Sequence, residues 1–159
     1  MNHPKAIVHL DRLARNYKIL SNSVNGKRLM AVVKANAYGH GAIECSKTLE
    51  DQGCDFFSVF TVEEAKELRN AGLKSDILIL SKLEKESIQT AIDNDLIVNI
   101  SSIDDLDSII FHLEKNGLSA RFHMKIETGM NRLGFDLSDI SLAIGKLLDY
   151  KNLNCEGIY

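Results

Sequence analysis

The fold class of this chain follows from one stretch, Met30-Ala31-Val32-Val33-Lys34-Ala35-Asn36-Ala37-Tyr38-Gly39-His40-Gly41. Its short apolar run, bounded by turn-forming residues, predicts a strand buried on both faces with Lys34 at the carboxyl end. Ligands bind at that end of the strands in α/β proteins. A desolvated lysine amine is a nucleophile for carbonyl compounds. The alternative is a strand-end lysine whose stem packs while its ammonium reaches water.

The composition is that of a globular protein and excludes several partner classes. The chain has 159 residues, of which 45% are hydrophobic and 26% charged, with a formal net charge of −3. It has no basic block, so we expect neither nucleic acid nor an anionic membrane as a partner. No apolar run has the length of a signal-peptide core or a membrane span. Three cysteines without a CxxC pair indicate free thiols and a reducing cytoplasm.

From Arg28 onward, predicted strands alternate with predicted helices at a βα period rather than a hairpin period. The expected strands are 28–34, 56–60, 76–80, 96–100, 120–126 and one that begins at Cys155. The expected helices are 43–50, 62–70, 84–93, 103–115 and 137–149, and Thr61 with Glu64 predicts a capping box before the second of them. Ahead of this repeat we expect a short strand at 6–10, a helix cap at Asp11 and a helix to about Asn22.

Two α/β folds suit this repeat, an open doubly wound sheet and a closed (β/α)8 barrel. No GxGxxG sequence follows the first strand, so the main signature of a dinucleotide fold is missing. We therefore predict an α/β fold of the (β/α)8 TIM-barrel type. Six strands do not close an eight-stranded barrel, so we expect the barrel to be present only in part.

A second loop, Glu127–Gly134, follows the strand that carries Lys125. Lys125 alternates with apolar neighbours, so it points inward, where a lysine must be paired or chemically modified. Arg132 supplies a charged fork for a carboxylate, a phosphate or a phenolate, the alternative being a surface ion pair with Glu127 or Asp136.

The histidines and acidic clusters favour structural roles. His40 is expected to be a hydrogen-bonding residue at a helix entry rather than an acid or base. His123 shares the face of Lys125 by period two, as a core or rim histidine. No metal site is predicted. HExxH spacing is missing, and the acidic residues at 104–107 are expected to cap a helix and compensate its dipole.

Two segments of the chain resemble those of a known family. Residues 31–41 look like the pyridoxal-phosphate attachment signature of alanine racemases, and Lys125–Gly134 resembles that family's Lys-x-Asp-Thr-Gly-Met-x-Arg-Leu-Gly segment, with Glu127 where Asp is more common. Residues 156–159 are similar to the start of the family's next barrel strand. The resemblance covers nearly the whole chain in order.

The resemblance implies a role for each matching residue. Lys34 would hold pyridoxal 5'-phosphate and act as one of two catalytic proton-transfer bases, and Tyr38 would bind the cofactor phosphate. Arg132 would contact the phenolic oxygen of the cofactor and the substrate carboxylate. Lys125 matches a lysine that is carbamylated in many members, which would give Arg132 an anionic partner.

The same resemblance implies an alanine racemase that acts in the cytoplasm as a homodimer and supplies D-alanine for peptidoglycan. It divides the chain into an N-terminal strand at 1–11, which would pair with a missing β-domain, and a partial barrel at 12–159. The second base would lie outside this chain, so we expect the fragment to be inactive alone.

Three alternatives remain open. The protein is a racemase of another amino acid such as serine, a non-catalytic pyridoxal-phosphate-binding barrel, or an interaction fragment whose exposed sheet edges pair with another copy.

Overall fold

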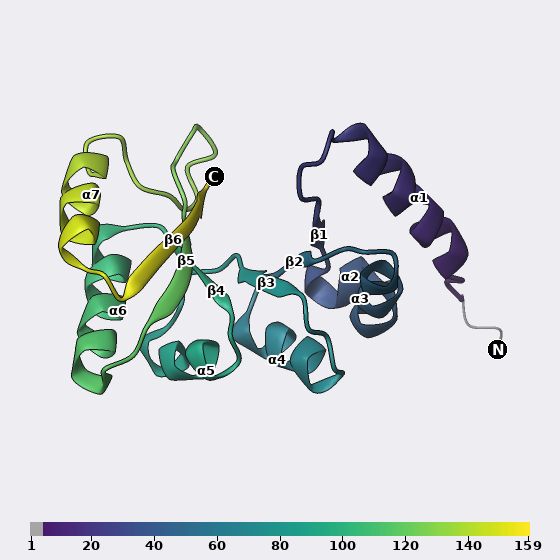
Figure 1. The fold of residues 1–159 in the computed structure, drawn as a ribbon, viewed down its shortest axis with the longest axis horizontal. Helices are drawn as coiled ribbons and strands as arrows, with labels where there is room; N and C mark the ends of the chain where they lie inside the picture. The colour runs from purple at the N-terminus through teal and green to yellow at the C-terminus, as the bar shows by residue number, and fades with distance from the viewer. Residues whose placement is uncertain (1–4) are drawn as a thin grey trace. The chain divides into compact units, whose positions relative to one another are not determined.

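The computed structural model describes residues 5–159, which divide into unit 1, up to Ile77, and unit 2, from Leu78 to Tyr159. Its six strands follow sequence order in one sheet, and the described pairings β1–β2, β3–β4, β4–β5 and β5–β6 are parallel. Strands alternate with helices along the coloured ribbon (Figure 1), as the βα period predicts. The strands are β1 Met30–Val32, β2 Phe56–Val59, β3 Asp76–Ile79, β4 Ile97–Ile100, β5 Ala120–Met124 and β6 Leu153–Ile158.

Unit 1 contains α1 Leu10–Ser23, α2 Lys34–Gly39, α3 Ala42–Asp51 and α4 Val62–Asn70 beside its strands. The predicted capping box is confirmed: the Thr61 hydroxyl accepts the Glu64 N–H, and the Glu64 carboxylate accepts the Thr61 N–H. The expectation that the first strand is buried on both faces is wrong. Val32 is 40% exposed and Met30 and Ala31 are only half-buried, because β1 has β2 alone as its described strand neighbour.

The start of the chain differs from the prediction. Residues 5–9 form no strand, and α1 begins at Leu10, so His9 rather than Asp11 is the N-cap. Short apolar runs do not distinguish a strand from a helix start, and here the helical spacing of the following residues extends back to Leu10. Residues 1–4, part of the predicted segment 1–11, lie outside the described residues.

An apolar hollow of about 390 Å³ lies between α1 and β1 in unit 1. Its lining includes Leu13, Leu20 and Val33. Although α1 contacts α3, no residue of this helix is buried in the described structure.

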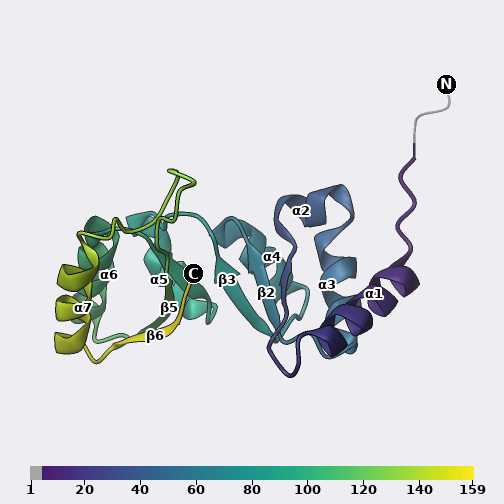
Figure 2. The same ribbon diagram turned by 90° about the horizontal axis from the view of Figure 1, so that it is seen from above.

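Unit 2 contains the short helix η1 Lys85–Ser87 followed by α5 Ile88–Asp93, and then α6 Ile103–Asn116 and α7 Ile140–Asp149. The last two lie side by side in both views (Figures 1 and 2), joined by an ion pair of 2.6 Å between Lys146 and Asp107. Ala120, Phe122 and Met124 are buried, whereas Arg121 and His123 between them are half-buried. One face of β5 therefore belongs to the apolar core, and the other carries polar side chains.

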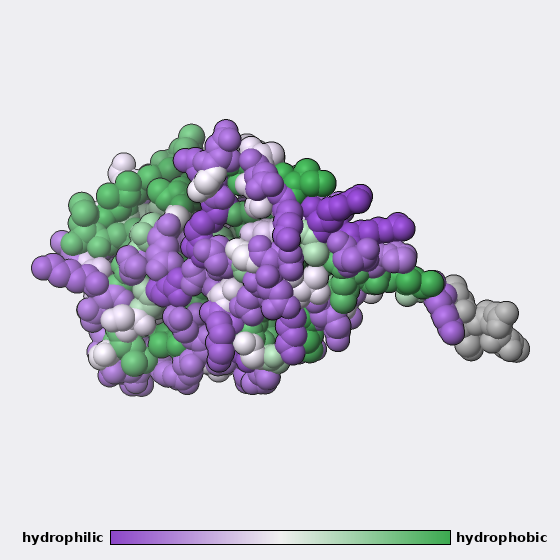
Figure 3. Space-filling view, turned by 45° about the vertical axis from the view of Figure 1, so that its right-hand side comes forward, coloured by the Kyte–Doolittle hydropathy of each residue, from purple (hydrophilic) through white to green (hydrophobic). Residues whose placement is uncertain are grey.

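Some apolar side chains remain at the surface. Leu142, Ile144 and Leu148 of α7 are exposed, and the face drawn in Figure 3 shows hydrophobic patches between larger hydrophilic areas. Within residues 5–159, no helix combines the length and apolar character needed to cross a bilayer.

Candidate active site

Lys34 lies where the chain leaves β1. The Val33 N–H donates to the Ser58 carbonyl at 2.9 Å, so pairing with β2 continues up to the residue before Lys34. Lys34 is half-buried, and its ammonium lies 5.7 Å from the centre of the Phe60 ring. The expected position at the carboxyl end of the strand is confirmed, and the amine faces an aromatic ring rather than a carboxylate.

The segment after Lys34 is a left-handed helical turn, not the open loop expected over 36–41. Residues 35–38 all have φ between 51° and 55°. Left-handed backbone costs roughly 1–2 kcal/mol for each L-residue, so other contacts must hold it. The Asn36 side-chain oxygen accepts the Ala42 N–H at 2.8 Å, and the Asn36 carbonyl accepts the Gly41 N–H at 3.0 Å. The turn ends with Tyr38 60% exposed, so its phenol is available to a ligand.

His40 takes the structural role expected of it. It is exposed, and its Nδ1 lies 2.8 Å from the Ala37 carbonyl oxygen, which only accepts, so Nδ1 carries the proton. Gly41 follows with φ +92° as the N-cap of α3, and a Cβ there would lie 2.9 Å from the Glu44 carboxylate. The glycine is therefore required by the turn into α3.

In unit 2, the strand register brings polar residues onto one face. Asn99 of β4 pairs with His123 of β5, which pairs with Gly157 of β6. A Cβ at Gly157 would lie 2.7 Å from the His123 ring, so the glycine makes room for the imidazole. His123 and Lys125 flank buried Met124, are both half-buried and both contact the Tyr159 ring, which confirms that they share a face.

Lys125 is paired with an aromatic residue. Its ammonium lies 4.4 Å from the centre of the Tyr159 ring, and the Tyr159 hydroxyl donates to Asn99 Oδ1 at 3.0 Å. Desolvation raises the pKa of Tyr159 to about 12, although the residue as a whole is 38% exposed, so the phenol is neutral at physiological pH. Asn99 is 1% exposed, and its Nδ2 has no hydrogen-bond partner in the described part of the chain.

The loop 127–134 is organised by Glu127, whose carboxylate accepts the backbone N–H groups of Gly129 and, at 3.2 Å, of Arg132. Backbone donors, Asn131 first among them, lower the pKa of Glu127. The Arg132 side chain is exposed and forms no ion pair with any residue in the range 5–159. Glu127 therefore binds the backbone of Arg132, and the alternative ion pair between their side chains does not form.

The predicted residues form two sets, each within its own unit. Lys34 and Tyr38 belong to unit 1, and Lys125 and Arg132 to unit 2. The donor chemistry fits pyridoxal phosphate: Lys34 offers a primary amine for its aldehyde, and Tyr38 an exposed hydroxyl for its phosphate. Arg132 offers a free guanidinium for a carboxylate or a phenolate.

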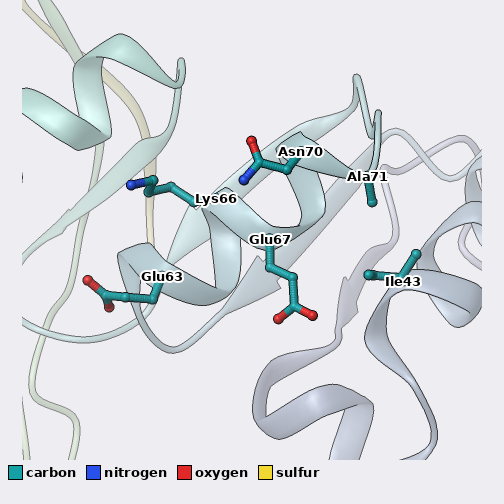
Figure 4. Close-up of a pocket in the computed structure, with 6 residues that line it drawn as sticks. All are labelled: Ile43, Glu63, Lys66, Glu67, Asn70 and Ala71. Atoms are coloured by element: carbon teal, nitrogen blue, oxygen red, sulfur yellow. The ribbon is translucent and has the colours of Figure 1, made fainter.

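The surface hollow beside α4 is a different feature. Its volume is about 550 Å³, and its lining comes mainly from α4 and carries Glu63, Lys66 and Glu67 (Figure 4). None of the predicted site residues lines it. No cluster of three or more His, Cys, Asp or Glu side chains suited to a metal ion occurs among the described residues.

The sequence patterns do not single out Phe60 and Tyr159 as contacts of the predicted lysines, or Asn99 as the partner of Tyr159. A signal existed for Asn99, the one polar residue in the apolar run Leu96–Ile100. Phe60 closes an apolar strand and reads as core, so its contact with Lys34 is visible only in three dimensions.

Comparison with known proteins places these residues in a family context. Residues 8–159 match the family model described as alanine racemase, N-terminal domain. An alanine racemase of Methanococcus maripaludis is 38% identical over 162 aligned residues, which cover 100% of this chain and 43% of that protein. The chain thus spans less than half the length of this relative.

Solved structures agree with the sequence comparison. The alanine racemase of E. faecalis has a TM-score of 0.86 at 32% identity, covering 95% of this chain and 42% of that one. A histidine racemase from Leuconostoc mesenteroides has a TM-score of 0.84 at 26% identity, covering 91% and 39%. The predicted fold class, an α/β fold of the TIM-barrel type with a parallel six-stranded sheet, is confirmed.

Proposed function

The chain belongs to the alanine racemase family, and from this premise we propose that its protein interconverts L- and D-alanine with pyridoxal phosphate bound at Lys34. The observation that carries the proposal is the position of Lys34, half-buried at the carboxyl end of β1 and followed by a left-handed turn that leaves Tyr38 exposed. When bound, pyridoxal phosphate withdraws electrons and makes the α-proton of an amino acid acidic.

Each site residue has a proposed task. The amine of Lys34 joins the cofactor and moves the α-proton on one face of the substrate. The Tyr38 hydroxyl donates to the cofactor phosphate, and the Arg132 guanidinium binds the substrate carboxylate or the phenolic oxygen. A carbamate on Lys125 would turn the cation above Tyr159 into an anion that holds Arg132.

Racemisation needs a base on each face of the substrate, and Lys34 serves one. The chain covers 43% of the Methanococcus maripaludis alanine racemase. We therefore propose that the second base belongs to the part of such proteins beyond the matched region. The purified 159-residue chain is then expected to lack racemase activity. Conversion of L- to D-alanine by that chain, detected by chiral chromatography, would contradict this part of the proposal.

The test of cofactor binding is spectroscopic. The chain mixed with pyridoxal phosphate is expected to show a visible absorption band that Lys34→Ala abolishes. Lys47→Ala is the matched control, because Lys47 is an exposed lysine of α3. A band that survives Lys34→Ala, or is lost equally in Lys47→Ala, overturns the assignment of Lys34.

A second candidate substrate is favoured by one observation, the fold similarity to a histidine racemase. The protein that contains this chain should therefore be assayed with alanine, serine and histidine in parallel. Alanine turning over fastest supports the proposal. Faster turnover of serine or histidine favours a racemase of that amino acid. Cofactor binding without racemisation of any of the three favours a non-catalytic pyridoxal-phosphate protein.

The cellular assignments are also proposals: supply of D-alanine for peptidoglycan, a cytoplasmic location and a homodimer. The first and third rest on the family, and the second on three cysteines without disulfides. Light scattering of the protein that contains this chain tests the dimer, which a monomeric mass would contradict.

A further inference from the structure

The carboxylate of Glu64 connects the end of β2 with the turn that follows Lys34. Its Oε1 accepts the Ala35 N–H at 2.7 Å. Its Oε2 accepts the Phe60 N–H at 2.7 Å and the Thr61 N–H at 3.3 Å. All of these residues belong to unit 1.

The capping box of α4 accounts for only part of this arrangement. Such a box requires one bond from the residue-64 side chain back to the Thr61 N–H, and Oε2 makes it. The bond from Ala35 to Oε1 adds nothing to the start of α4. It fixes a segment 29 residues earlier in the chain.

The Ala35 N–H belongs to the peptide that joins Lys34 to the left-handed turn. Ala35 is the first of the four residues with positive φ, so its peptide sets the direction in which the chain leaves β1. Hydrogen bonds to an ionised acceptor are roughly twice as strong as neutral ones. The carboxylate therefore stabilises a backbone conformation that is unfavourable for alanine by itself.

The same carboxylate fixes the residue that faces the Lys34 amine. Glu64 holds the Phe60 backbone, and the Phe60 ring lies 5.7 Å from the Lys34 ammonium. One side chain thus controls both the peptide behind Lys34 and the aromatic surface beside its amine.

We propose that Glu64 is a positioning residue for Lys34, which holds the lysine backbone and the Phe60 ring in the arrangement that accepts pyridoxal phosphate. This inference rests on the proposed function of Lys34. In this role Glu64 acts through the Ala35 and Phe60 backbones, to which its carboxylate is bonded.

The test compares two substitutions that both damage the capping box. Glu64→Gln replaces one acceptor oxygen by a donor, so the bond to Ala35 or those to Phe60 and Thr61 must be lost. Thr61→Ala removes the hydroxyl half of the box and leaves the carboxylate in place. Urea unfolding measures how far each substitution weakens the fold.

The readout is the covalent attachment of pyridoxal phosphate to Lys34, trapped with borohydride and measured by mass spectrometry on the full chain. We expect the apparent affinity to fall on the order of 10-fold in Glu64→Gln and to stay unchanged in Thr61→Ala, because misplaced reacting groups lose effective concentration. Equal affinity in the two variants overturns the proposal. If Glu64→Gln does not fold, Glu64→Asp takes its place with the same criteria.

A second measurement separates this inference from the proposed function. Amide hydrogen exchange at Ala35, followed by NMR without cofactor, is expected to accelerate on the order of 10-fold in Glu64→Gln and not in Thr61→Ala. If the wild-type chain does not bind pyridoxal phosphate, the proposed function fails, and unchanged exchange at Ala35 independently overturns the role of Glu64.

Discussion

The ammonium of Lys125 lies 4.4 Å from the centre of the Tyr159 ring, whose hydroxyl donates to Asn99 at 3.0 Å. A half-buried cation thus has an aromatic partner, and that partner is fixed by a fully buried amide. A cation–π contact of this kind contributes about 0.5–2 kcal/mol, more as it is desolvated. Asn99 belongs to β4, and Lys125 and Tyr159 directly follow β5 and β6, so their contact stabilises the pairing of these strands.

Substitution of Tyr159 separates the two parts of this contact. Tyr159→Phe keeps the ring but leaves Asn99 without a partner for its oxygen, and should lower the free energy of unfolding by about 1–3 kcal/mol. Tyr159→Leu also removes the cation–π contact and should cost about 0.5–2 kcal/mol more. Urea unfolding measures both values. Equal stabilities of the Phe and Leu variants would show that the ring does not stabilise Lys125.

The pKa of Tyr159, raised by burial to about 12, predicts a pH dependence of stability. Between the ordinary pKa of 10.0 and about 12, the unfolded chain loses this proton while the folded chain keeps it. Stability is therefore unaffected by Tyr159 below pH 10 and falls as the pH rises from 10 towards 12. Unfolding measured from pH 8 to 12 should show a larger loss in the wild type than in Tyr159→Phe, because Tyr17, Cys45 and Cys54, whose pKa values are also raised, contribute to the loss in both. The same slope in both proteins would contradict the assignment.

The capping box and the face of β5 were accessible from sequence, because both depend on spacing within a few residues. Thr61 and Glu64 specify a local helix start, and the alternation around Lys125 specifies a face. The left-handed turn at 35–38 was not accessible. The sign of φ there depends on hydrogen bonds with Ala42 and with Glu64. Glu64 lies 29 residues beyond Ala35, and the four residues 35–38 carry no signal of that contact by themselves.

The prediction that β1 is buried on both faces was wrong for a related reason. An apolar run predicts what a strand prefers to contact, whereas burial depends on which neighbours are present. Val32 satisfies the pattern and is still 40% exposed. The contact between Lys125 and Tyr159 was missed because it joins the ends of two strands through a ring, and no spacing rule reports it.

Gly134 should be intolerant of any side chain. Its φ is +142°, and a Cβ there would lie 2.4 Å from the Glu127 nitrogen and 2.7 Å from the Ile126 carbonyl carbon. These are backbone atoms, so relief requires movement of the 127–134 loop, and Gly134→Ala should cost roughly 1–3 kcal/mol in unfolding free energy.

Gly129→Ala is the matched control for this substitution, because Gly129 lies in the same loop with φ +125° and open space around it. It should be the milder change, since it adds backbone strain without a collision. Equal destabilisation of the two variants in urea would show that strain alone, and not the contact with Glu127, determines the requirement for glycine.

Asp105 at the start of α6 should make the chain sensitive to acid. Its side chain is 4% exposed and lies 2.9 Å from the Lys82 ammonium, and its second oxygen accepts the Ser101 hydroxyl at 2.8 Å and the Ser101 N–H at 3.1 Å. Burial raises the pKa of Asp105, but Lys82 and Ser101 together outweigh burial and hold that pKa below its usual 3.8. The stabilisation is therefore complete above about pH 4 and is lost as the pH falls through the pKa of the folded state.

Asp105→Asn tests this dependence against Asp104→Asn, a control on an exposed neighbour in the same helical turn. At pH 7, Asp105→Asn should lower the free energy of unfolding by about 1–3 kcal/mol, because the Lys82 pair and one Ser101 donor lose their charged acceptor. Asp104→Asn should change it by less than about 0.5 kcal/mol. Between pH 7 and pH 3 the wild type and Asp104→Asn should lose more stability than Asp105→Asn does. An identical acid loss in all three proteins would mean that the Asp105 carboxylate is not the group whose protonation weakens the fold.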